Sequence, residues 1–559
     1  MNSAGHSAAS NSAQTGSFSL TSLVGVGLAA YRAARISRLS DLEYWKFETA
    51  RLQVAQLRRN LKFAARTEIG RSLSFGKLAA LPDKDLLPAY RKSLPVADWY
   101  RYKDQIARMR ENAERDVLWP GLVEDFAQTS GTTAGDKFIP VSKQMLRSNF
   151  LASLDIFGNM SRFGVRLPQL TGGKSLFLGG STNLETNRHG IRTGDLSGIV
   201  TPLIRWPIST MYLPGPAIAL ESHWPTKIQK MAERCVDEDV RMISGMPSWA
   251  LVLFERVIAL RNERKAGSAK TIRDVWRNLT IFVHGGVKYT PFEPRVRQMW
   301  SGSPDGADLP FRLELYPASE GFVAMQDTRG DPGLRLCSDQ GNFFEFVPLE
   351  RINEPDAPGY AAWEVEKGQR YVVTLSTCAG LWRYVLGDVV EFDTIPANLD
   401  GKGGEGPCRM RIVGRHRHFI NAFGENLIVE HIENAVAAAA KASGLIVAEF
   451  TAAPVYPKDG QRAGLELAVE IESKPGMAPA ALETFRAEFD RSLKAQNNDY
   501  TTKRTDALGM AEPTITPLPV GAFHRWLTSK GKLGGQHKCP RCANGREIIE
   551  GVVGIARQG

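Results

Sequence analysis

The sequence predicts a mixed α/β protein with a large amino-terminal domain and a smaller α+β carboxy-terminal domain. Three observations predict this fold class. The chain has 559 residues, more than one ordinary core accommodates. Short apolar, strand-like pieces alternate with helical stretches through most of it. A glycine-rich run at residues 400–406 then marks a loop, and after Gly414 the spacing of apolar residues changes.

The large domain is expected at residues 41–413 and begins with a helix. Between residues 41 and 67, Trp45, Leu57 and Leu61 recur at roughly helical spacing among charged residues. Further along, we expect strands at 175–178, 280–283 and 371–375 and a helix at 249–264. In the small domain, residues 414–559, we expect helices at 429–442 and 480–496 and strands at 447–452 and 465–471.

Residues 1–40 are expected to form a leader. Residues 1–17 are rich in Ser, Ala and Asn, which predicts disorder. The apolar run at 18–30 is too short to span a bilayer and lacks the basic start of a secretion signal. We interpret it as a docking helix, with peripheral membrane contact as the alternative. No integral membrane span is expected.

Composition limits the class of partner. With 43% hydrophobic and 23% charged residues, the chain is typical of a soluble globular protein. The formal charge of +10 favours anionic partners, among them nucleic acid, an acidic membrane surface and phosphate-bearing substrates. The densest basic clusters, at 62–71 and 411–417, lack the interleaved aromatic residues of a single-strand-binding surface. We therefore expect no nucleic-acid partner.

Cysteine usage favours a reducing, cytoplasmic compartment. Four of the six cysteines are isolated, which is not the pattern of a disulfide framework. Cys539 and Cys542 have the spacing of metal ligands, and His537 lies nearby. A structural zinc site normally needs a second ligand pair, and none occurs at suitable spacing. Zinc is therefore the minor alternative for this segment.

The most informative motif lies at residues 129–137, where hydroxyl-bearing residues and glycines alternate before Lys137. The glycines let the backbone turn tightly, so that its N–H groups face an anion, and the hydroxyls add donors. The segment differs from the nucleotide loop of kinases and GTPases, because three residues separate its glycines and Asp136 precedes the lysine. It predicts a phosphate-binding turn; a surface turn rich in Ser and Thr is the alternative.

Four further motifs follow in order. His284 and two glycines end a β-rich run, where a flat ring could approach the backbone. Tyr316 and Glu320 bring a ring and a carboxylate together, suited to stacking a base and holding a magnesium ion. Asp388 follows a glycine and is suited to bonding a ribose diol, and Arg415 stands at the start of the small domain. Each motif alone is also compatible with a purely structural role.

Together, in this order, the motifs resemble the acyl-adenylate-forming superfamily and, within it, the auxin-responsive Gretchen Hagen family of acyl acid amido synthetases. Further segments look like that family's landmarks and extend the likeness from Thr67 to Arg541; they lie at 67–70, 94–100, 196–198, 245–249, 497–504 and 535–541. The resemblance implies a large multi-layer α/β domain of the acyl-adenylate-forming type, followed by a smaller α+β domain.

The resemblance implies a two-step ligase that uses ATP and Mg²⁺. A small carboxylic acid attacks the α-phosphate of ATP, giving an acyl-adenylate and pyrophosphate, and an amine, in this family usually that of an amino acid, then displaces AMP. Two alternatives remain open. The acyl group could pass to coenzyme A, or the chain could be a non-catalytic relative that binds nucleotide and acid without turnover.

The resemblance also implies roles for particular residues. Those expected to bind the nucleotide are Thr129, Ser130, Gly131, Thr132, Thr133, Gly285, Gly286, Tyr316, Ser319, Glu320, Asp388, Arg415 and Asn426. Within this set, the first five hold the phosphates, Gly285, Gly286 and Tyr316 flank the adenine, Glu320 carries magnesium and Asp388 holds the ribose. The catalytic cations are Lys538 and Arg415; for Lys538 the alternative is a surface lysine in a basic tail.

Two departures from the family pattern affect these roles. Many relatives carry a lysine after the acidic residue of the hinge segment, whereas Asn426 follows Glu425 here, so the charge near the phosphate is expected from Arg415 or Arg417. Asp136 would repel phosphate if it pointed inward, and we expect it to face solvent.

Switching between the two steps implies rotation of the small domain about residues 414–416. The acid pocket is expected between the first loop and the segment at 245–247. Trp206, Met246 and Trp249 are candidates to line it, with core packing as the alternative.

Overall fold

The computed structural model describes residues 22–31, 33–129, 137–179, 184–203, 208–221, 224–286, 289–416, 419–420, 427–455, 464–472, 479–497, 500–501, 504, 510–530, 538–543 and 545–558. The expectations for the leader at 1–17 lie outside these ranges. So do several single residues named above: Ser130, Gly131, Thr132, Thr133, Asp136, Trp206, Arg417, Glu425, Asn426 and His537.

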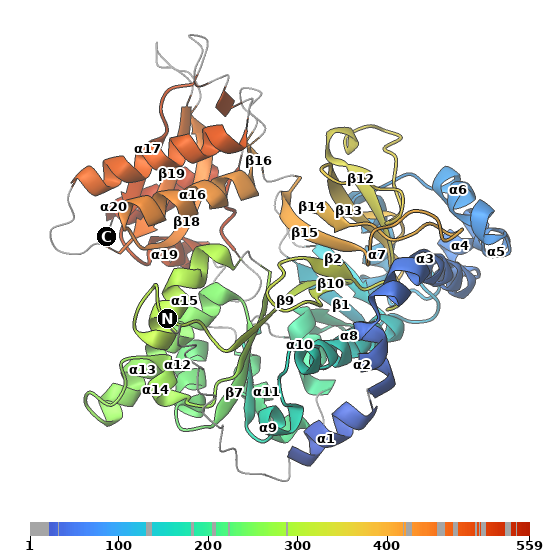
Figure 1. Cartoon of the computed structure of the whole chain (residues 1–559). Coiled ribbons are helices and arrows are strands. Elements are labelled where there is room, and N and C mark those ends of the chain that lie inside the picture. Colours follow the sequence, from blue (N-terminus) through green and yellow to red (C-terminus); the bar gives the residue numbers. More distant parts are fainter. Residues whose placement is uncertain are drawn as a thin grey trace, which may run out of the picture.

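The larger part of the molecule is built on an eleven-stranded mixed sheet with the order β12-β13-β14-β15-β11-β10-β9-β8-β7-β3-β6 (Figure 1). Its strands are β3 (Lys174–Phe177), β6 (Tyr212–Leu213), β7 (Val240–Gly245), β8 (Ile281–Gly285), β9 (Phe311–Ala318), β10 (Gly321–Gln326), β11 (Leu334–Leu336), β12 (Phe343–Pro348), β13 (Arg370–Ser376), β14 (Tyr384–Thr394) and β15 (Arg409–Arg415). In this spatial order, the neighbouring strands from β6 across to β9 are parallel to one another. Each neighbouring pair from β9 across to β12 is antiparallel. The three expected strands are confirmed as β3, β8 and β13.

Helices cover both faces of the parallel half, because successive side chains of a strand point to opposite faces. Ile281 and Val283 of β8 pack in a core with α8 (Lys143–Arg162) and α9 (Leu167–Thr171). Phe282 packs in a second core with α12 (Trp224–Cys235), α13 (Pro247–Arg264) and α15 (Glu293–Ser301). The layered α/β arrangement is therefore confirmed, and the helix expected at 249–264 is α13.

A separate four-stranded sheet, with the order β2-β1-β5-β4, carries the phosphate-turn motif. Its strands are β1 (Asp125–Thr129), β2 (Lys137–Val141), β4 (Glu185–Thr186) and β5 (Arg192–Gly194). β1 and β2 are antiparallel, and Thr129 lies opposite Lys137. The motif therefore connects two adjacent strands, and both of its ends are fixed by the ladder.

The amino-terminal helices pack against this sheet and the antiparallel half of the large one. The expected helix is confirmed as α3 (Leu42–Ala64), whose start is capped by Asp41, since its carboxylate accepts a 2.9 Å hydrogen bond from the Tyr44 N–H. The remaining helices of the large part are α1 (Ser22–Tyr31), α2 (Ala33–Ser40), α4 (Glu68–Ser72), α5 (Phe75–Ala79), α6 (Asp83–Ser93), α7 (Lys103–Glu111), α10 (Leu196–Val200), α11 (Pro216–Ala219) and α14 (Ile272–Val275).

The interpretation of the apolar run at 18–30 as a docking helix is supported by α1. A Cβ added to Gly25 would lie 2.6 Å from the Leu167 carbonyl oxygen, so this face of α1 packs directly on α9. Leu23 and Val26 are exposed. No helix in the described part of the chain is long and apolar enough to cross a membrane.

The carboxy-terminal part is a small α+β unit on a three-stranded sheet, β18-β19-β20. Its elements are β16 (Phe419–Ile420), β17 (Leu427–Ile428), α16 (Val429–Ser443), β18 (Val447–Val455), β19 (Gly464–Ile471), α17 (Pro479–Gln496), β20 (Thr514–Leu518), α19 (Ala522–Ser529) and α20 (Glu547–Gln558). One face packs on α16 and α17, and the other on α19 and α20. The four elements expected here are confirmed as α16, β18, β19 and α17.

Cys539 and Cys542 point into different cores of this unit. Cys539 packs with α19 and α20, whereas Cys542 packs with α16 and α17, and burial raises the pKa of both thiols. Among the described residues, no group of three or more His, Cys, Asp or Glu side chains is placed to hold a metal ion. The spacing of the pair is thus accounted for by hydrophobic packing on both faces of the small sheet.

Candidate active site

The paired glycines Gly285 and Gly286, at the end of β8, form the centre of the candidate site. A Cβ on Gly285 would lie 2.5 Å from the Leu315 carbonyl oxygen of β9, so only glycine lets the two strands approach here. Gly286 has φ +80°, in the left-handed region that favours glycine, and a Cβ there would lie 2.8 Å from Lys538 Nζ. The glycine pair therefore permits close contacts with β9 and with Lys538 at the carboxyl end of the parallel strands, where open α/β sheets bind ligands.

Lys538 reaches the glycine pair from the carboxy-terminal part. Its ammonium donates a hydrogen bond to the Gly286 carbonyl oxygen. Although the residue as a whole is exposed, the ammonium lies among protein atoms, and this burial, together with the positive charge of Arg415, lowers its pKa to about 8. Asp388 acts in the opposite direction and favours the charged form.

Asp388 is held between a cation and a phenol. Arg415 donates from Nε to Oδ1 at 2.6 Å, and the Tyr316 hydroxyl donates to Oδ2 at 2.7 Å. The first contact follows from the fold, because Asp388 of β14 lies opposite Arg415 of β15. Tyr316 as a whole is only 4% exposed. In this arrangement it supports Asp388 and offers little surface on which an adenine could stack.

Glu320 lies in the turn between β9 and β10 beside Ser319, and only 7% of it is exposed. Burial raises the pKa of its carboxyl, while Arg415 and a hydrogen bond from Tyr384 work against the rise. Tyr384 begins β14, and burial and the nearby Glu320 charge raise the pKa of its phenol. Sequence reasoning missed Tyr384, because only the pairing of distant strands brings its hydroxyl to Glu320.

The expected hinge, residues 414–416, is bonded to β14. The His416 N–H donates to the Gly387 carbonyl oxygen at 2.9 Å, and His416 Nδ1 lies 3.0 Å from the same oxygen. Gly387 has φ +97°, and a Cβ there would lie 3.1 Å from the His416 ring. The position of the chain as it leaves the large sheet is thus fixed by a contact that needs glycine.

The segment at 245–247 lies at the same carboxyl end of the parallel strands, because β7 ends at Gly245. Met246 Sδ would be 3.4 Å from a Cβ on Gly286. Trp249 instead packs against the core that α12 and α13 form with the sheet. Of the three residues suggested for the acid pocket, Met246 therefore adjoins the glycine pair, Trp249 adjoins the core, and Trp206 is outside the described residues.

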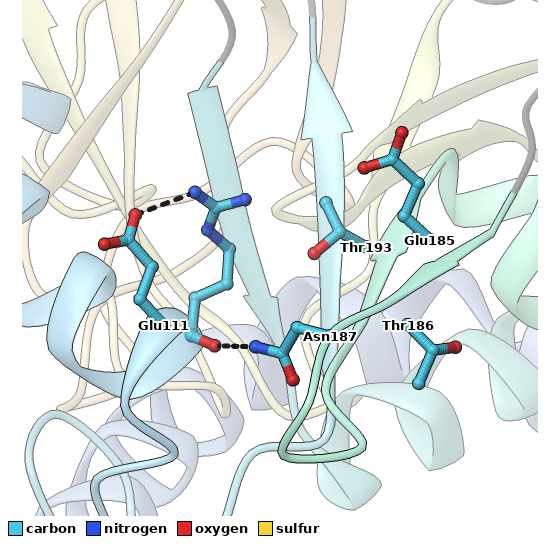
Figure 2. A pocket seen from close by; sticks show the side chains of 6 residues that line it. Glu111, Glu185, Thr186, Asn187 and Thr193 are labelled. Carbon is cyan, nitrogen blue, oxygen red and sulfur yellow. Dashed lines mark hydrogen bonds and ion pairs between the residues drawn. The ribbon is translucent and has the colours of Figure 1, made fainter.

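A small hollow of about 170 Å³ lies on the four-stranded sheet, and none of the residues that line it is a predicted site residue (Figure 2). It is lined by Arg110, Glu111, Glu185, Thr186, Asn187 and Thr193. The Arg110 guanidinium lies 3.7 Å from the Phe138 ring centroid and bonds Glu111 at 2.9 Å, and the Asn187 amide donates to the Arg110 carbonyl oxygen at 2.7 Å. These contacts tie α7 to β2, which follows the phosphate-turn motif, and to the residue after β4.

The structure thus brings Gly285, Gly286, Glu320, Asp388 and Lys538 together. Arg415 and Tyr316 both bond directly to Asp388. The residues of the site come from β8, the β9–β10 turn, β14, β15 and the carboxy-terminal part. Thr129 is the last residue of β1 and the first residue of the phosphate-turn motif.

Comparison with known proteins shows the same fold in solved structures. An acyl acid amido synthetase, AtGH3.15 in complex with 2,4-DB, superposes with a TM-score of 0.73 at 17% identity, covering 94% of this chain and 96% of that one. A 2-hydroxyisobutyryl-CoA ligase in the postadenylation state superposes with a TM-score of 0.51 at 14% identity, covering 93% and 96%. The expected acyl-adenylate-forming fold is therefore confirmed.

Sequence comparison agrees along the chain. The indole-3-acetic acid-amido synthetase GH3.3 of Arabidopsis thaliana is 22% identical over 544 residues, which cover 82% of this chain and 85% of that protein. The GH3 family N-terminal domain matches residues 38–214, the GH3 family central domain residues 336–399, and the GH3 family C-terminal domain residues 430–547. Because successive domains of one family match in order and together span more than half of the residues, this chain belongs to the GH3 family.

Proposed function

We propose that this protein is an ATP-dependent acyl acid amido synthetase, a ligase that adenylates a small carboxylic acid and transfers the acyl group to the amine of an amino acid. The observation that carries the proposal is the convergence of Glu320, Asp388 and Lys538 beside the glycine pair after β8. Membership of the GH3 family and the named activities of its relatives support the same reaction.

In the first step, a carboxylate oxygen of the acid bonds to the α-phosphorus of ATP. The bond from that phosphorus to the bridging oxygen of the β-phosphate breaks, and pyrophosphate leaves. Negative charge shifts onto phosphate oxygens, so cations already fixed in place stabilise the transition state. We assign this role to Lys538 and Arg415. With a pKa of about 8, the Lys538 ammonium is mostly charged at pH 7.

Glu320 is the residue that fits a magnesium ion. Mg²⁺ is commonly held by one or two carboxylates together with substrate phosphates, so a single buried carboxylate at the nucleotide is a sufficient protein donor. The hydrogen bond from Tyr384 and the charge of Arg415 favour the ionised form that can act as a ligand. When bound, the ion would neutralise charge on the phosphate oxygens.

Asp388 is assigned to the ribose hydroxyls. Each of its oxygens already accepts one bond, from Arg415 or Tyr316, and an ionised carboxylate can accept more. The two existing bonds hold the carboxylate in one orientation. The phosphates are assigned to the turn of Thr129, Ser130, Gly131, Thr132 and Thr133 together with Asn426, and the adenine to Gly285 and Gly286.

In the second step, the amine nitrogen bonds to the acyl carbon, the bond from that carbon to the AMP oxygen breaks, and the amine loses a proton. We infer that residues 414–559 rotate about 414–416 between the steps. We assign the contact of Lys538 with Gly286 to the first step, because it holds the cation beside the proposed nucleotide site. Closure in each step would exclude water from the reactive adenylate.

We assign the protein to the cytoplasm. All six cysteines are free thiols and buried. A reducing compartment keeps such thiols from forming disulfides.

Exchange of labelled pyrophosphate into ATP tests the proposal. We expect exchange that depends on an acid when aromatic and aliphatic carboxylic acids are supplied one at a time. Mass analysis with amino acids should then reveal an amide, and parallel reactions with coenzyme A should yield no thioester. A thioester product would support the coenzyme A ligase instead, and absence of exchange with every acid would support the non-catalytic relative.

A further inference from the structure

Lys227, near the start of α12, is a buried cation that the proposed chemistry does not use. It is 1% exposed. Its ammonium donates to the Ala219 carbonyl oxygen at 2.7 Å and to the Gly179 carbonyl oxygen at 3.2 Å. Ala219 ends α11, and Gly179 lies just beyond β3. Lys227 therefore joins three separate elements at one point.

Two carboxylates act on this ammonium. Burial lowers the Lys227 pKa to about 8, whereas Asp195 and Glu221 favour the charged form. Asp195 precedes α10 and is 2% exposed, and burial raises its pKa to about 6. Each of these two groups therefore favours the charged form of the other. Burying charged groups is costly, and such groups persist in the interior where they are paired and hydrogen-bonded.

The Gly179 carbonyl to which Lys227 donates lies at the carboxyl end of the parallel strands, as the candidate site does. Leu178, the residue before Gly179, donates from its N–H to the Ser244 carbonyl oxygen at 2.7 Å. A Cβ on Gly245 would lie 2.5 Å from Leu178 Cβ, so the two strand ends are in close contact. Met246 follows Gly245 and adjoins Gly286. One continuous series of contacts therefore leads from Lys227 to the glycine pair.

We propose that Lys227 is a positioning residue for the acid substrate: by holding Gly179 and Ala219 it fixes the end of β3, and with it the wall that Gly245 and Met246 form beside the nucleotide. This inference rests on the proposed function, because it assigns the acid to that wall. An apolar side chain in its place would leave two half-buried carbonyl oxygens without this donor, and the strand end would be held less firmly.

Lys227→Met tests the proposal, with Lys230→Met as the matched control. Lys230 lies on the same helix but is exposed and pairs with Glu221 at 2.6 Å. In pyrophosphate exchange we expect Lys227→Met to raise KM for the acid at least tenfold, while KM for ATP stays within twofold. Lys230→Met should change neither constant by more than twofold. Equal rises in both constants for Lys227→Met would overturn the proposal.

Hydrogen–deuterium exchange of the full-length chain without substrate gives a second readout, independent of the reaction. Lys227→Met should speed amide exchange at residues 176–179 and 219–221 and leave the carboxy-terminal unit unchanged. If wild type shows no pyrophosphate exchange, the proposed function fails, yet this readout still tests whether Lys227 holds the strand end. Faster exchange throughout the chain would contradict local positioning. Should Lys227→Met fail to fold, Asp195→Asn is expected to cause smaller changes in the same places, and unchanged behaviour would count against the idea.

Discussion

Gly285 and Gly286 determine how closely other groups approach the end of β8. Gly285→Ala would place a methyl group 2.5 Å from a backbone oxygen of β9, which cannot move without shifting the strand. We expect a loss of stability of about 1–3 kcal/mol, as for overpacking, and weaker ATP binding. Thermal unfolding and KM for ATP measure the two effects.

Gly554→Ala is the control for this substitution, because a Cβ at this helical glycine meets nothing within 4 Å. It should raise stability by about 0.5–1 kcal/mol, since alanine loses less conformational freedom in a helix. Equal behaviour of the two variants would show that the packing at Gly285 is not tight.

The Lys538 ammonium predicts how adenylation depends on pH. Its pKa is lowered to about 8, so the active cationic form is present below pH 8 and is lost as the pH rises through that value. In pyrophosphate exchange, kcat/KM should therefore fall above pH 8, because this ratio reports the ionisation of the free enzyme. Lys538→Arg should remove the fall, since a guanidinium stays charged. A fall that persists in Lys538→Arg would show that another group titrates.

The hydroxyl of Tyr384 is expected to lower the pKa of Glu320. Its hydrogen bond stabilises the carboxylate and opposes the rise in the Glu320 pKa. Tyr384→Phe should therefore raise that pKa further and shift the acidic limb of the kcat/KM profile to higher pH. Tyr360→Phe, which alters a tyrosine that packs against Tyr371, should leave the limb in place. A shift in both variants, or in neither, would contradict the assignment.

The sequence indicates which residues of the candidate site carry reactive or polar groups, but not how these groups bond to one another. Asp388 and Arg415 were recognised as ligand-binding types, yet their 2.6 Å contact depends on the register of β14 against β15. Tyr316 was expected at the adenine because aromatic rings stack on bases. Its hydroxyl instead bonds Asp388, an outcome set by which side chains the fold places opposite its ring.

Elements whose apolar residues repeat regularly could be predicted with nearly correct bounds. The helix expected between 41 and 67 is α3, because its buried residues follow the helical period and Asp41 caps it. In the antiparallel half of the large sheet, the strand that the sequence analysis predicts is β13. β14 and β15 pair across the glycine-rich loop at 400–406, and a loop of that length gives no sign of which strands it joins.

Helix α15 forms one of the contacts between the two parts of the molecule. Its Arg295 pairs with Glu255 of α13 at 2.8 Å and with Glu472, which follows β19, at 3.1 Å. The Arg541 guanidinium also lies 5.6 Å from the ring centroid of Phe292, just before α15. These contacts hold the arrangement in which Lys538 touches Gly286.

Arg295→Ala should therefore weaken the first step more than the second. A partly exposed ion pair contributes about 0.2–1 kcal/mol, which corresponds to a roughly 1.4- to fivefold loss of pyrophosphate exchange. The rate of amide formation from added acyl-adenylate should not fall. Arg297→Ala is the control, because Arg297 lies on the same helix and pairs with Glu293 within the large part at 2.6 Å. Equal losses in both steps would argue against a role for this contact in switching.

For the whole molecule, the sequence predicted two parts of different size and the order of the motifs along the chain. It could not predict that Lys538 contacts Gly286, because 252 positions separate them and the contact depends on how the two parts meet. The same limit applies to Lys227, whose burial at the end of β3 follows from the packing of three elements rather than from any local pattern.

The central claim is that segments far apart in the chain bind one adenine nucleotide at the end of β8. A crystal structure with a non-hydrolysable acyl-adenylate analogue tests it most directly. We predict the adenine against Gly285 and Gly286, the ribose hydroxyls within hydrogen-bond distance of Asp388, and the phosphate analogue beside Lys538 or Arg415. An analogue bound elsewhere, with Asp388 and Lys538 both out of its reach, would contradict the account.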